Sequence, residues 1–576
     1  MKKNDTPHNS DQPAPPSDGA LSTELDNPAR RRFLAGASVL GLSSGLLPLA
    51  QATAAKTPPA QRLHQLPARE QDRLLRQHIH HIVVIYAENR SFNNLFANFP
   101  GVEKPLSSLT KEQYQQRDRD GSLLNELPPI WKGLVPDAQT VNHTQYHIDQ
   151  QVPWLQHLPN QPFSLKGPAG EYLPQGVVTR DLWHVFYQNQ MQINGGKNDR
   201  FVAWADSGAL TMGYYADSAW NLRLWKLAQQ YTLCDNFFQG AFGGSFLNHQ
   251  YLVAAQPPVY PDVYNSPAKN LVATLMSDDP ADPRLKPLDA SPHSALEGIP
   301  QFGPSQITPD GYAVNTMLPP YWPSGSRDPK NPALADPSSP KTLPAQTHTH
   351  IGDLLSQKGI DWAWYAGGWQ FALDDHQDSK TFPPRPYFQL HHQPLNYFEN
   401  LGPQHKEYRQ THLRDGGLGD SADTNHFLAA AAAGKLPPVS FYKPQGNLNM
   451  HAGYSDVDAG DRHIAHIIDG LQQSPLWQNT VVVVTFDENG GWWDHIAPPK
   501  GDRWGPGTRI PALVISPFAR KGHVEHSQYD TGSILRLISR VFDLPHLPGL
   551  TQRDHALRKN GHPPMGDLSE TLEFPL

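Results

Sequence analysis

The sequence has 576 residues, of which 38% are hydrophobic, so it can bury a large core in one elaborated domain or in several. Its formal net charge of −8 and its 18% of charged residues argue against a nucleic-acid-binding surface. The single cysteine, Cys234, excludes an intrachain disulfide and a cysteine metal cluster, and its apolar neighbours predict a buried, inert thiol.

An export signal is predicted within residues 1–54. Three arginines, Arg30 to Arg32, precede a mildly apolar run and small residues suited to cleavage near Ala52 to Ala54. This pattern resembles a twin-arginine signal, which implies the twin-arginine translocation machinery as a partner and a periplasmic or secreted location. A basic patch before a buried helix, or a membrane anchor, is the alternative, but the run is short and diluted by glycines. The mature chain, residues 55–576, is expected to have no integral membrane segment.

Four apolar runs rich in β-branched residues predict strands that are covered on both faces: Ile82 to Ala87, Val439 to Tyr442, Val481 to Phe486 and Ala512 to Ser516. Four amphipathic segments predict helices: Asp217 to Tyr231, His350 to Gly359, Asp461 to Gln473 and Thr531 to Phe542. The predicted fold class is α/β, with one large, mostly parallel central sheet and helices on both faces. Residues 256–346 are irregular and proline-rich, and predict a long decorated insertion, not a second core.

Polar side chains follow two of the predicted strands directly. Glu88 and Asn89 come after the first, and Asp487 and Glu488 come after the third. In open α/β sheets, ligands bind in the crevice beyond the carboxyl ends of the strands, so the two clusters are expected to converge. Either cluster alone could be an ordinary polar strand end. Three carboxylates in one place are costly without a cation, so together they predict a divalent metal site.

Five motifs carry a family resemblance, and they span nearly the whole mature chain: "ENRSFNNLF" (Glu88 to Phe96), "GGSFLNHQY" (Gly243 to Tyr251), "FQLHHQPLNYF" (Phe388 to Phe398), "MHAGYS" (Met450 to Ser455) and "FDENGGWWDHIAPP" (Phe486 to Pro499). In this order they resemble the bacterial phosphoesterase family of secreted acid phosphatases and non-haemolytic phospholipases C, within the alkaline phosphatase superfamily. The resemblance implies an alkaline-phosphatase-like fold.

The resemblance also implies roles for single residues. It assigns Glu88, Asn89, Ser245, Asp487 and Glu488 to the metal, and makes Ser245 the nucleophile. It places further residues in the pocket, with His392, His451 and His495 as catalytic and His184, Asn248 and His391 as substrate-binding. Asn93-Asn94 departs from the Asp-His pair that many members carry after "ENRSF", which puts the rim of the pocket in doubt.

The expected function is hydrolysis of phosphate monoesters by a metal-dependent acid phosphatase, through a phosphoserine intermediate. Histidines that stabilise the phosphoryl group and protonate the leaving oxygen predict an acidic optimum. The metal could be calcium, iron, manganese, magnesium or zinc. A phospholipase C that acts on phosphatidylcholine-type lipid head groups is the alternative, and a catalytically dead periplasmic binding protein on the same fold is an alternative of another class.

Several residues have simpler interpretations. Asp217-Ser218-Ala219 is similar to the nucleophile motif of two-zinc alkaline phosphatases, but a helix N-cap is the preferred interpretation. No Cys-x-Pro-x-Arg element occurs, which argues against a formylglycine sulfatase. His463 and His466 are expected at the surface or at the boundary of the apolar face of their helix. Trp492 and Trp493 either line the cleft or cover the sheet edge, and the sequence does not distinguish these two roles.

Overall fold

The computed structural model describes residues 61–215, 218–374 and 387–575 of the chain. Within these residues, eight strands form a central sheet in the order β10-β9-β11-β2-β12-β13-β7-β14. Neighbours are parallel from β10 to β12 and between β7 and β14, whereas β13 is antiparallel to both β12 and β7. The strands are β2 (His81–Ala87), β7 (Thr232–Cys234), β9 (Trp362–Gly367), β10 (Leu413–Gly417), β11 (Val439–Lys443), β12 (Thr480–Phe486), β13 (Ala512–Ile515) and β14 (His523–Glu525).

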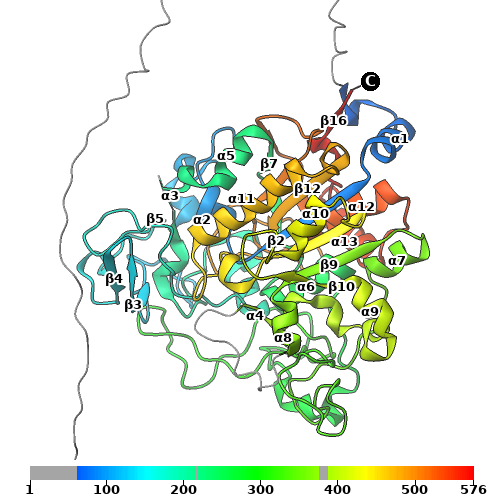
Figure 1. The fold of residues 1–576 in the computed structure, drawn as a ribbon. Coiled ribbons are helices and arrows are strands. Elements are labelled where there is room, and N and C mark those ends of the chain that lie inside the picture. The colour runs from blue at the N-terminus through cyan, green and yellow to red at the C-terminus, as the bar shows by residue number, and fades with distance from the viewer. Residues whose placement is uncertain (1–60, 216–217, 375–386, 576) are drawn as a thin grey trace, which may run out of the picture. The chain divides into compact units, whose positions relative to one another are not determined.

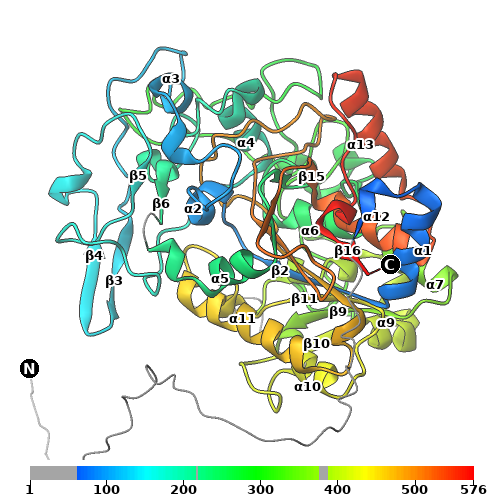
Figure 2. The same ribbon diagram turned by 90° about the horizontal axis from the view of Figure 1, so that it is seen from above.

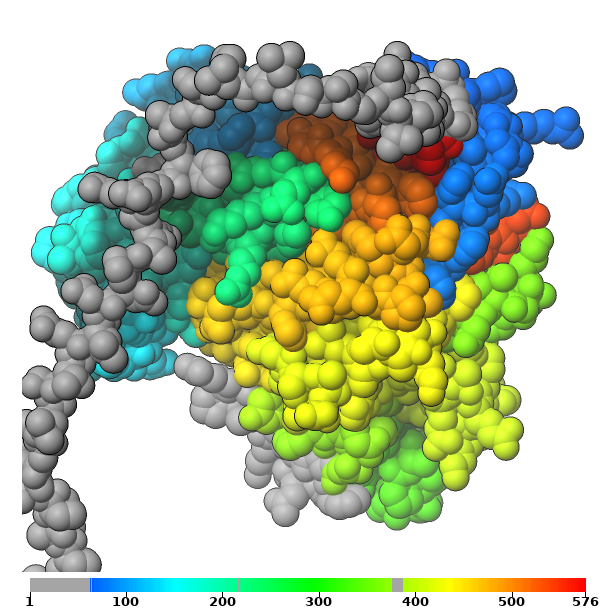
Figure 3. Space-filling view, turned by 45° about the horizontal axis from the view of Figure 1, so that its top comes forward, coloured from blue at the N-terminus to red at the C-terminus, as the bar shows by residue number. Residues whose placement is uncertain are grey.

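Helices cover both faces of this sheet (Figure 1). One layer contains α5 (Arg223–Gln230), α11 (Val457–Gln473) and α10 (His426–Ala432), and the other contains α6 (Ser245–Ala254) and α12 (Thr531–Phe542), as Figure 2 shows from above. In Figure 3, α5 in green and α11 in gold lie side by side on one face. The α/β class and the mostly parallel central sheet are therefore confirmed.

The remaining elements surround this core. The other helices are α1 (Ala68–His78), α2 (Phe92–Phe96), α3 (Lys111–Tyr114), α4 (Phe186–Ile193), α7 (Ile351–Gln357), α8 (Trp369–Asp374), α9 (Lys406–His412) and α13 (Pro548–Lys559). Short strands pair as β1 (Gln61–Arg62) with β16 (Glu573–Phe574), β3 (Val135–Val141) with β4 (Thr144–Ile148), β5 (Phe163–Ser164) with β6 (Gly213–Tyr214), and β8 (Phe237–Phe238) with β15 (Tyr529–Asp530).

The four predicted strands correspond to β2, β11, β12 and β13, each within one residue at either end. They lie at the centre of the sheet, and nearly every side chain in them is buried. Continuous runs of Val and Ile were informative because such strands have no solvent-facing side. Cys234 is fully buried in β7, and burial raises the pKa of its thiol well above the usual value, so the prediction of a buried thiol is confirmed.

Two local predictions are wrong. His463 is buried in α11, where Nε2 lies 2.8 Å from the Tyr442 hydroxyl and Nδ1 contacts Asp420. The predicted helix from Asp217 is shorter, because α5 starts at Arg223, and Asp217 lies outside the described residues. The Ser218 side chain makes no capping hydrogen bond; Asp461 of α11 instead accepts the first backbone N–H groups of α5 at 2.7 and 2.9 Å.

Residues 256–346 contain two short 3₁₀ helices, Val263–Asn265 and Pro267–Leu271, and isolated bridges such as the one between Val259 and Tyr312. The segment belongs to the same compact unit as the sheet. The predicted signal at residues 1–54 lies outside the described residues. Among the described residues, no helix is both long enough and apolar enough to span a membrane.

Candidate active site

The two polar clusters that follow β2 and β12 lie side by side. These strands are adjacent and parallel, and their last residues, Ala87 and Phe486, are register partners. The backbone N–H of Asp487 donates to Ala87 O at 3.0 Å, and the N–H of Asn89 donates to Asp487 Oδ1 at 3.1 Å. Gly490 allows this close packing, since its φ is 61° and a Cβ there would collide with the Asn89 carbonyl. The predicted convergence of the strand ends is therefore observed.

Ser245 lies at the first position of α6, directly facing these clusters. Its Oγ is 3.4 Å from Glu88 Oε2, 3.3 Å from Asn89 Oδ1 and 3.2 Å from Glu488 Oε1. A hydroxyl has one proton, so it can donate to only one of these three oxygens at a time. The free N–H groups of the first turn of α6 also favour negative charge at this position.

The oxygen atoms around Ser245 carry more negative charge than the nearby groups compensate. Although burial opposes ionisation, Lys443 and His392 hold the pKa of Glu88 well below its usual range. Burial and the charge of Glu88 raise the pKa of Asp487 to about 7, and burial and Asp487 raise that of Glu488 well above its usual value. Asp487 Oδ2 is buried and, among the described residues, has no hydrogen-bond partner. A divalent cation fits this all-oxygen donor set, and Glu88, Asn89, Ser245, Asp487 and Glu488 are the residues that would hold it.

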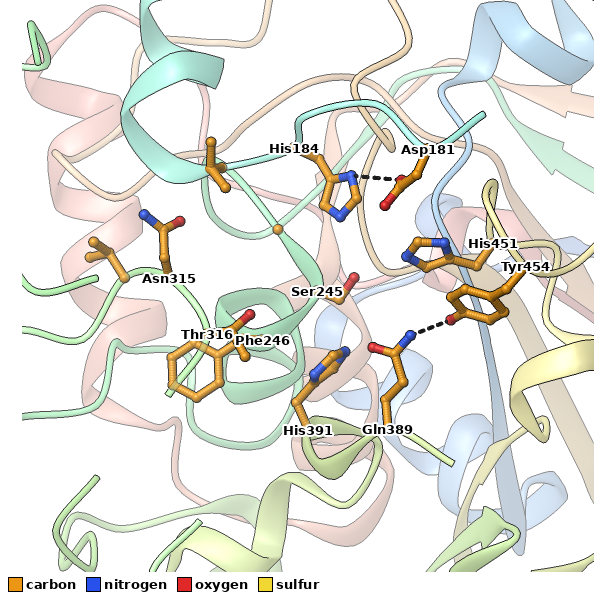
Figure 4. Close-up of a pocket in the computed structure, with 13 residues that line it drawn as sticks. Asp181, His184, Ser245, Phe246, Asn315, Thr316, Gln389, His391, His451 and Tyr454 are labelled. Carbon is orange, nitrogen blue, oxygen red and sulfur yellow. Dashed lines mark hydrogen bonds and ion pairs between the residues drawn. The ribbon is translucent and has the colours of Figure 1, made fainter. Parts of the chain in front are cut away.

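A pocket with a volume of about 360 Å³ opens above Ser245. Figure 4 shows Ser245 between His184 and His391, with His451 on the side of Gln389 and Tyr454. Burial lowers the pKa of all three histidines; for His391 the neighbouring His392 lowers it further. His451 Nδ1 contacts the Ala452 carbonyl, which leaves Nε2 facing Glu88 Oε2 at 3.8 Å.

Three residues that the resemblance placed in the pocket do not line it. Asn248 is fully buried, and its amide donates to the carbonyls of Ala241, Gly243 and Gly244 at 3.1 to 3.3 Å. Its Oδ1 accepts the Ala241 N–H at 2.9 Å, so the side chain shapes the turn before Ser245 and has no proton left for a phosphoryl oxygen. The predicted phosphate contact of Asn248 is therefore wrong in this structure.

The other two residues are His392 and His495. His392 is fully buried behind Glu88, with Nε2 2.7 Å from Oε1, so it supports the carboxylate and does not reach the pocket. The ring nitrogens of His495 lie 2.9 Å from Asn93 Oδ1 and 2.9 Å from Lys104 O, which corrects its predicted catalytic position. Trp492 and Trp493 are also buried and do not line the pocket. Arg90 Cζ lies 5.5 Å from the centroid of the Trp492 ring, and Trp493 Nε1 donates to Asn198 O at 2.8 Å.

The loop after β2 is held in place by Arg90 and Ser91, which directly follow the metal-site candidates Glu88 and Asn89. Arg90 donates to Met450 O at 2.8 and 3.0 Å and to Asn94 Oδ1 at 3.3 Å. Ser91 caps α2 by accepting the Asn94 N–H and donates to Trp493 O at 2.9 Å. Asn94 thus acts within the loop and not at the rim of the pocket.

Sequence reasoning missed three charged or titratable neighbours. Lys443 ends β11, the strand beside β2, and its Nζ contacts Glu88 Oε1. His249 follows Ser245 by one helical turn, so its Nδ1 lies 2.7 Å from Ser245 O and 3.7 Å from Asp487 Oδ2. Asp181 lies 3.7 Å from His184 Nδ1 and is half exposed. For Lys443 a signal existed, since a lysine that directly follows a buried strand lies at the same sheet edge as Glu88.

The proline-rich segment contributes one wall of the pocket. Val314, Asn315 and Thr316 line it opposite His451, as Figure 4 shows for the two labelled residues. Asn315 joins this wall to the start of α4, because its Oδ1 accepts the Phe186 N–H at 2.9 Å. With Val185 and Phe246, this side of the pocket is more apolar than the histidine side.

Comparison with known proteins identifies the family. The family model described as "Phosphoesterase family" matches residues 79–545, which include the metal-site candidates, Ser245 and the pocket histidines. The chain therefore belongs to the Phosphoesterase family.

Single relatives match over shorter stretches. Phospholipase C B of Mycobacterium tuberculosis is 31% identical over 173 residues, which cover 26% of this chain and 32% of the relative. Non-specific phospholipase C6 of Arabidopsis thaliana is 31% identical over 160 residues, which cover 22% of this chain and 30% of the relative. Non-hemolytic phospholipase C of Pseudomonas aeruginosa is 28% identical over 174 residues, which cover 25% of this chain and 24% of the relative. The chain thus spans less than a third of the length of each of these relatives.

Solved structures with some similarity include a protein in the alkaline phosphatase superfamily from Vibrio parahaemolyticus. It aligns with a TM-score of 0.29 and 11% identity, over 65% of this chain and 67% of that one. Murine ectonucleotide pyrophosphatase/phosphodiesterase 5 aligns with a TM-score of 0.26 and 10% identity, over 56% of this chain and 90% of that one.

Proposed function

We propose that the protein hydrolyses phosphate monoesters, with Ser245 as the nucleophile and a divalent metal ion as cofactor. The observation that carries this proposal is the position of Ser245 Oγ, within 3.4 Å of oxygens from Glu88, Asn89 and Glu488 at the base of a histidine-lined pocket. Membership of the Phosphoesterase family supports it.

A divalent ion bound by these oxygens would neutralise the carboxylates and lower the pKa of the Ser245 hydroxyl. Ser245 Oγ would then form a bond to phosphorus while the bond from phosphorus to the leaving oxygen breaks, leaving a phosphoserine. The N-terminal N–H groups of α6 favour the negative charge that builds up on the phosphoryl group. Attack of water on the phosphoserine releases inorganic phosphate and restores the hydroxyl.

The pocket histidines lie where one of them could act as the general acid of this reaction. His184, His391 and His451 surround Ser245, and one imidazolium among them would give its proton to the leaving oxygen. Because burial lowers their pKa values, this form becomes populated only as the solution becomes acidic. An acid phosphatase is therefore the proposed type, and an activity profile that peaks above about pH 8 would contradict it.

The first test is hydrolysis of p-nitrophenyl phosphate by the wild type, by Ser245→Ala and by the matched variant Ser218→Ala. We expect Ser245→Ala to lose at least about a thousandfold in kcat, as removal of a nucleophile does, and Ser218→Ala to keep wild-type activity. Chelation followed by return of single metals identifies the ion. Full activity in Ser245→Ala would overturn the proposal. A wild-type protein that binds phosphate but does not hydrolyse p-nitrophenyl phosphate would instead favour a catalytically dead binding protein.

A phospholipase C activity is the second candidate. It is favoured by the names of the relatives and by the apolar wall of Val185, Phe246 and Val314, which suits an apolar leaving alcohol. Release of diacylglycerol from phosphatidylcholine vesicles at a kcat/KM above that for p-nitrophenyl phosphate would establish it. We also propose export through residues 1–54 to a periplasmic or secreted location; Arg30→Lys with Arg31→Lys should retain the precursor in the cytoplasm of the producing cell.

A further inference from the structure

A second cavity, with a volume of about 360 Å³, lies between the end of α4 and the proline-rich segment. It shares no lining residue with the pocket above Ser245. Met191, Trp204 and Leu285 supply apolar surface, and three arginines, Arg119, Arg200 and Arg284, supply charge. None of the described residues that line it is an aspartate or a glutamate. This combination of an apolar interior and positive charge distinguishes it from an ordinary surface hollow.

Two of the three arginines are already occupied by the protein. The Arg119 guanidinium donates to the carbonyls of Ala203, Pro292, Ser294 and Gly298 at 2.5 to 3.0 Å. It also lies over the Trp204 ring, with Cζ 5.9 Å from the centroid. The Arg284 guanidinium donates hydrogen bonds to both carboxylate oxygens of Asp282 at 2.7 to 3.2 Å. Arg119 is therefore a fixed part of the cavity wall, and the charge of Arg284 is largely compensated.

Arg200 is different. Among the described residues, its guanidinium forms no hydrogen bond or ion pair, and its Nε is buried without a partner. Asp120 interacts with it electrostatically, but that carboxylate is exposed and accepts hydrogen bonds from Ser122. A buried donor on a charged group is costly to leave unsatisfied, so this guanidinium is suited to an anion that enters the cavity.

We propose that this cavity binds an amphiphilic anion: an apolar chain that lies against Met191, Trp204 and Leu285 and ends in a carboxylate or phosphate paired with Arg200. Both head groups match the planar, multi-donor guanidinium. The cavity volume falls within the range of small-molecule sites. The proposal is independent of the proposed hydrolysis, because no residue of the catalytic pocket takes part in it.

The test is calorimetric binding of decanoate, decyl phosphonate and decanol below their aggregation limits to the full-length protein. Decyl phosphonate has a carbon–phosphorus bond and is not a substrate for ester hydrolysis, and the two acids distinguish carboxylate from phosphate recognition. We expect at least one acid to bind the wild type, and decanol to bind at least about tenfold more weakly. Equal binding of decanol, or no binding of either acid, would overturn the proposal.

Two variants localise the binding. Arg200→Gln should weaken it by at least about tenfold, since it removes the charge-assisted hydrogen bonds, and should leave hydrolysis of p-nitrophenyl phosphate unchanged. Met276→Glu places a negative charge at an exposed position of the rim and should also weaken binding. Leu296→Glu, an exposed residue of the same segment outside the cavity lining, is the matched control. Wild-type affinity in both Arg200→Gln and Met276→Glu would place the acid elsewhere and overturn the proposal.

Discussion

The Nε2 atom of His392 lies 2.7 Å from Oε1 of Glu88, and both side chains are fully buried. Lys443 Nζ contacts the same oxygen from β11, whereas Oε2 of Glu88 faces Ser245 Oγ. The two oxygens of one carboxylate are thus divided between a cationic support behind the site and the nucleophile in front of it.

This division predicts that Lys443→Met is strongly destabilising. The variant removes one of the two groups that compensate Glu88, and breaking a buried ion pair costs about 3–5 kcal/mol in free energy of unfolding, of which His392 should recover a part. Urea unfolding measures the loss, with the exposed Lys435→Met as a control that should change stability by less than about 0.5 kcal/mol. The double variant Lys443→Met with Glu88→Gln should be less destabilised than the single one. An unchanged urea midpoint in Lys443→Met would contradict the ion pair.

Asn248 should act through the backbone before Ser245. Asn248→Asp keeps the oxygen that accepts the Ala241 N–H but loses both protons of the amide, so we expect a loss of about 1–3 kcal/mol in stability. Because the turn positions the nucleophile, kcat should fall by more than tenfold with little change in KM. The same change at the exposed Asn331 should have neither effect. A rise in KM alone would instead restore a phosphate contact for Asn248.

Metal binding should release protons below neutral pH. In the metal-free protein burial and the charge of Glu88 raise the pKa of Asp487 to about 7, so its carboxyl is mostly protonated at pH 6, and burial and Asp487 raise the pKa of Glu488 above its usual value. A bound cation favours the carboxylates, so Asp487 should release about one proton per ion at pH 6 and less at pH 8. Calorimetry in buffers of different ionisation enthalpy counts these protons. A proton release that does not change between pH 6 and pH 8 would argue against these ligands.

His348 should make the fold sensitive to acid. Burial lowers its pKa from 6.5 to about 4, and Nε2 is buried without a hydrogen-bond partner among the described residues. Between these two pH values the unfolded chain takes up the proton and the folded chain does not, so the free energy of unfolding falls as the pH is lowered. His348→Phe keeps the ring contact with Phe398 and should remove at most about 3 kcal/mol of this fall. The exposed His293→Phe should leave the pH dependence unchanged, and an equal slope in wild type and His348→Phe would refute the prediction.

The sequence by itself determined the central part of this protein. Runs such as Ile82 to Ala87 and Val481 to Phe486 are apolar at every position because both faces of their strands are covered, so strand type and burial could be read from composition. The carboxyl ends of parallel strands share one edge, and this rule alone predicts that Glu88 and Asp487 lie close together, as they do at the ends of β2 and β12.

Only the tertiary structure decided which way the surrounding side chains point. Asn248, His392 and His495 lie in the motifs of the family, yet each directs its polar atoms toward protein groups and not into the pocket. Asp181 reaches the site through loop packing, which sequence spacing does not encode. The end of the strand at Lys443 could be read from the sequence, but its contact with Glu88 depends on β11 lying next to β2. The physical reason is that periodicity reports burial, whereas the partner of a buried polar group depends on which distant backbone happens to face it.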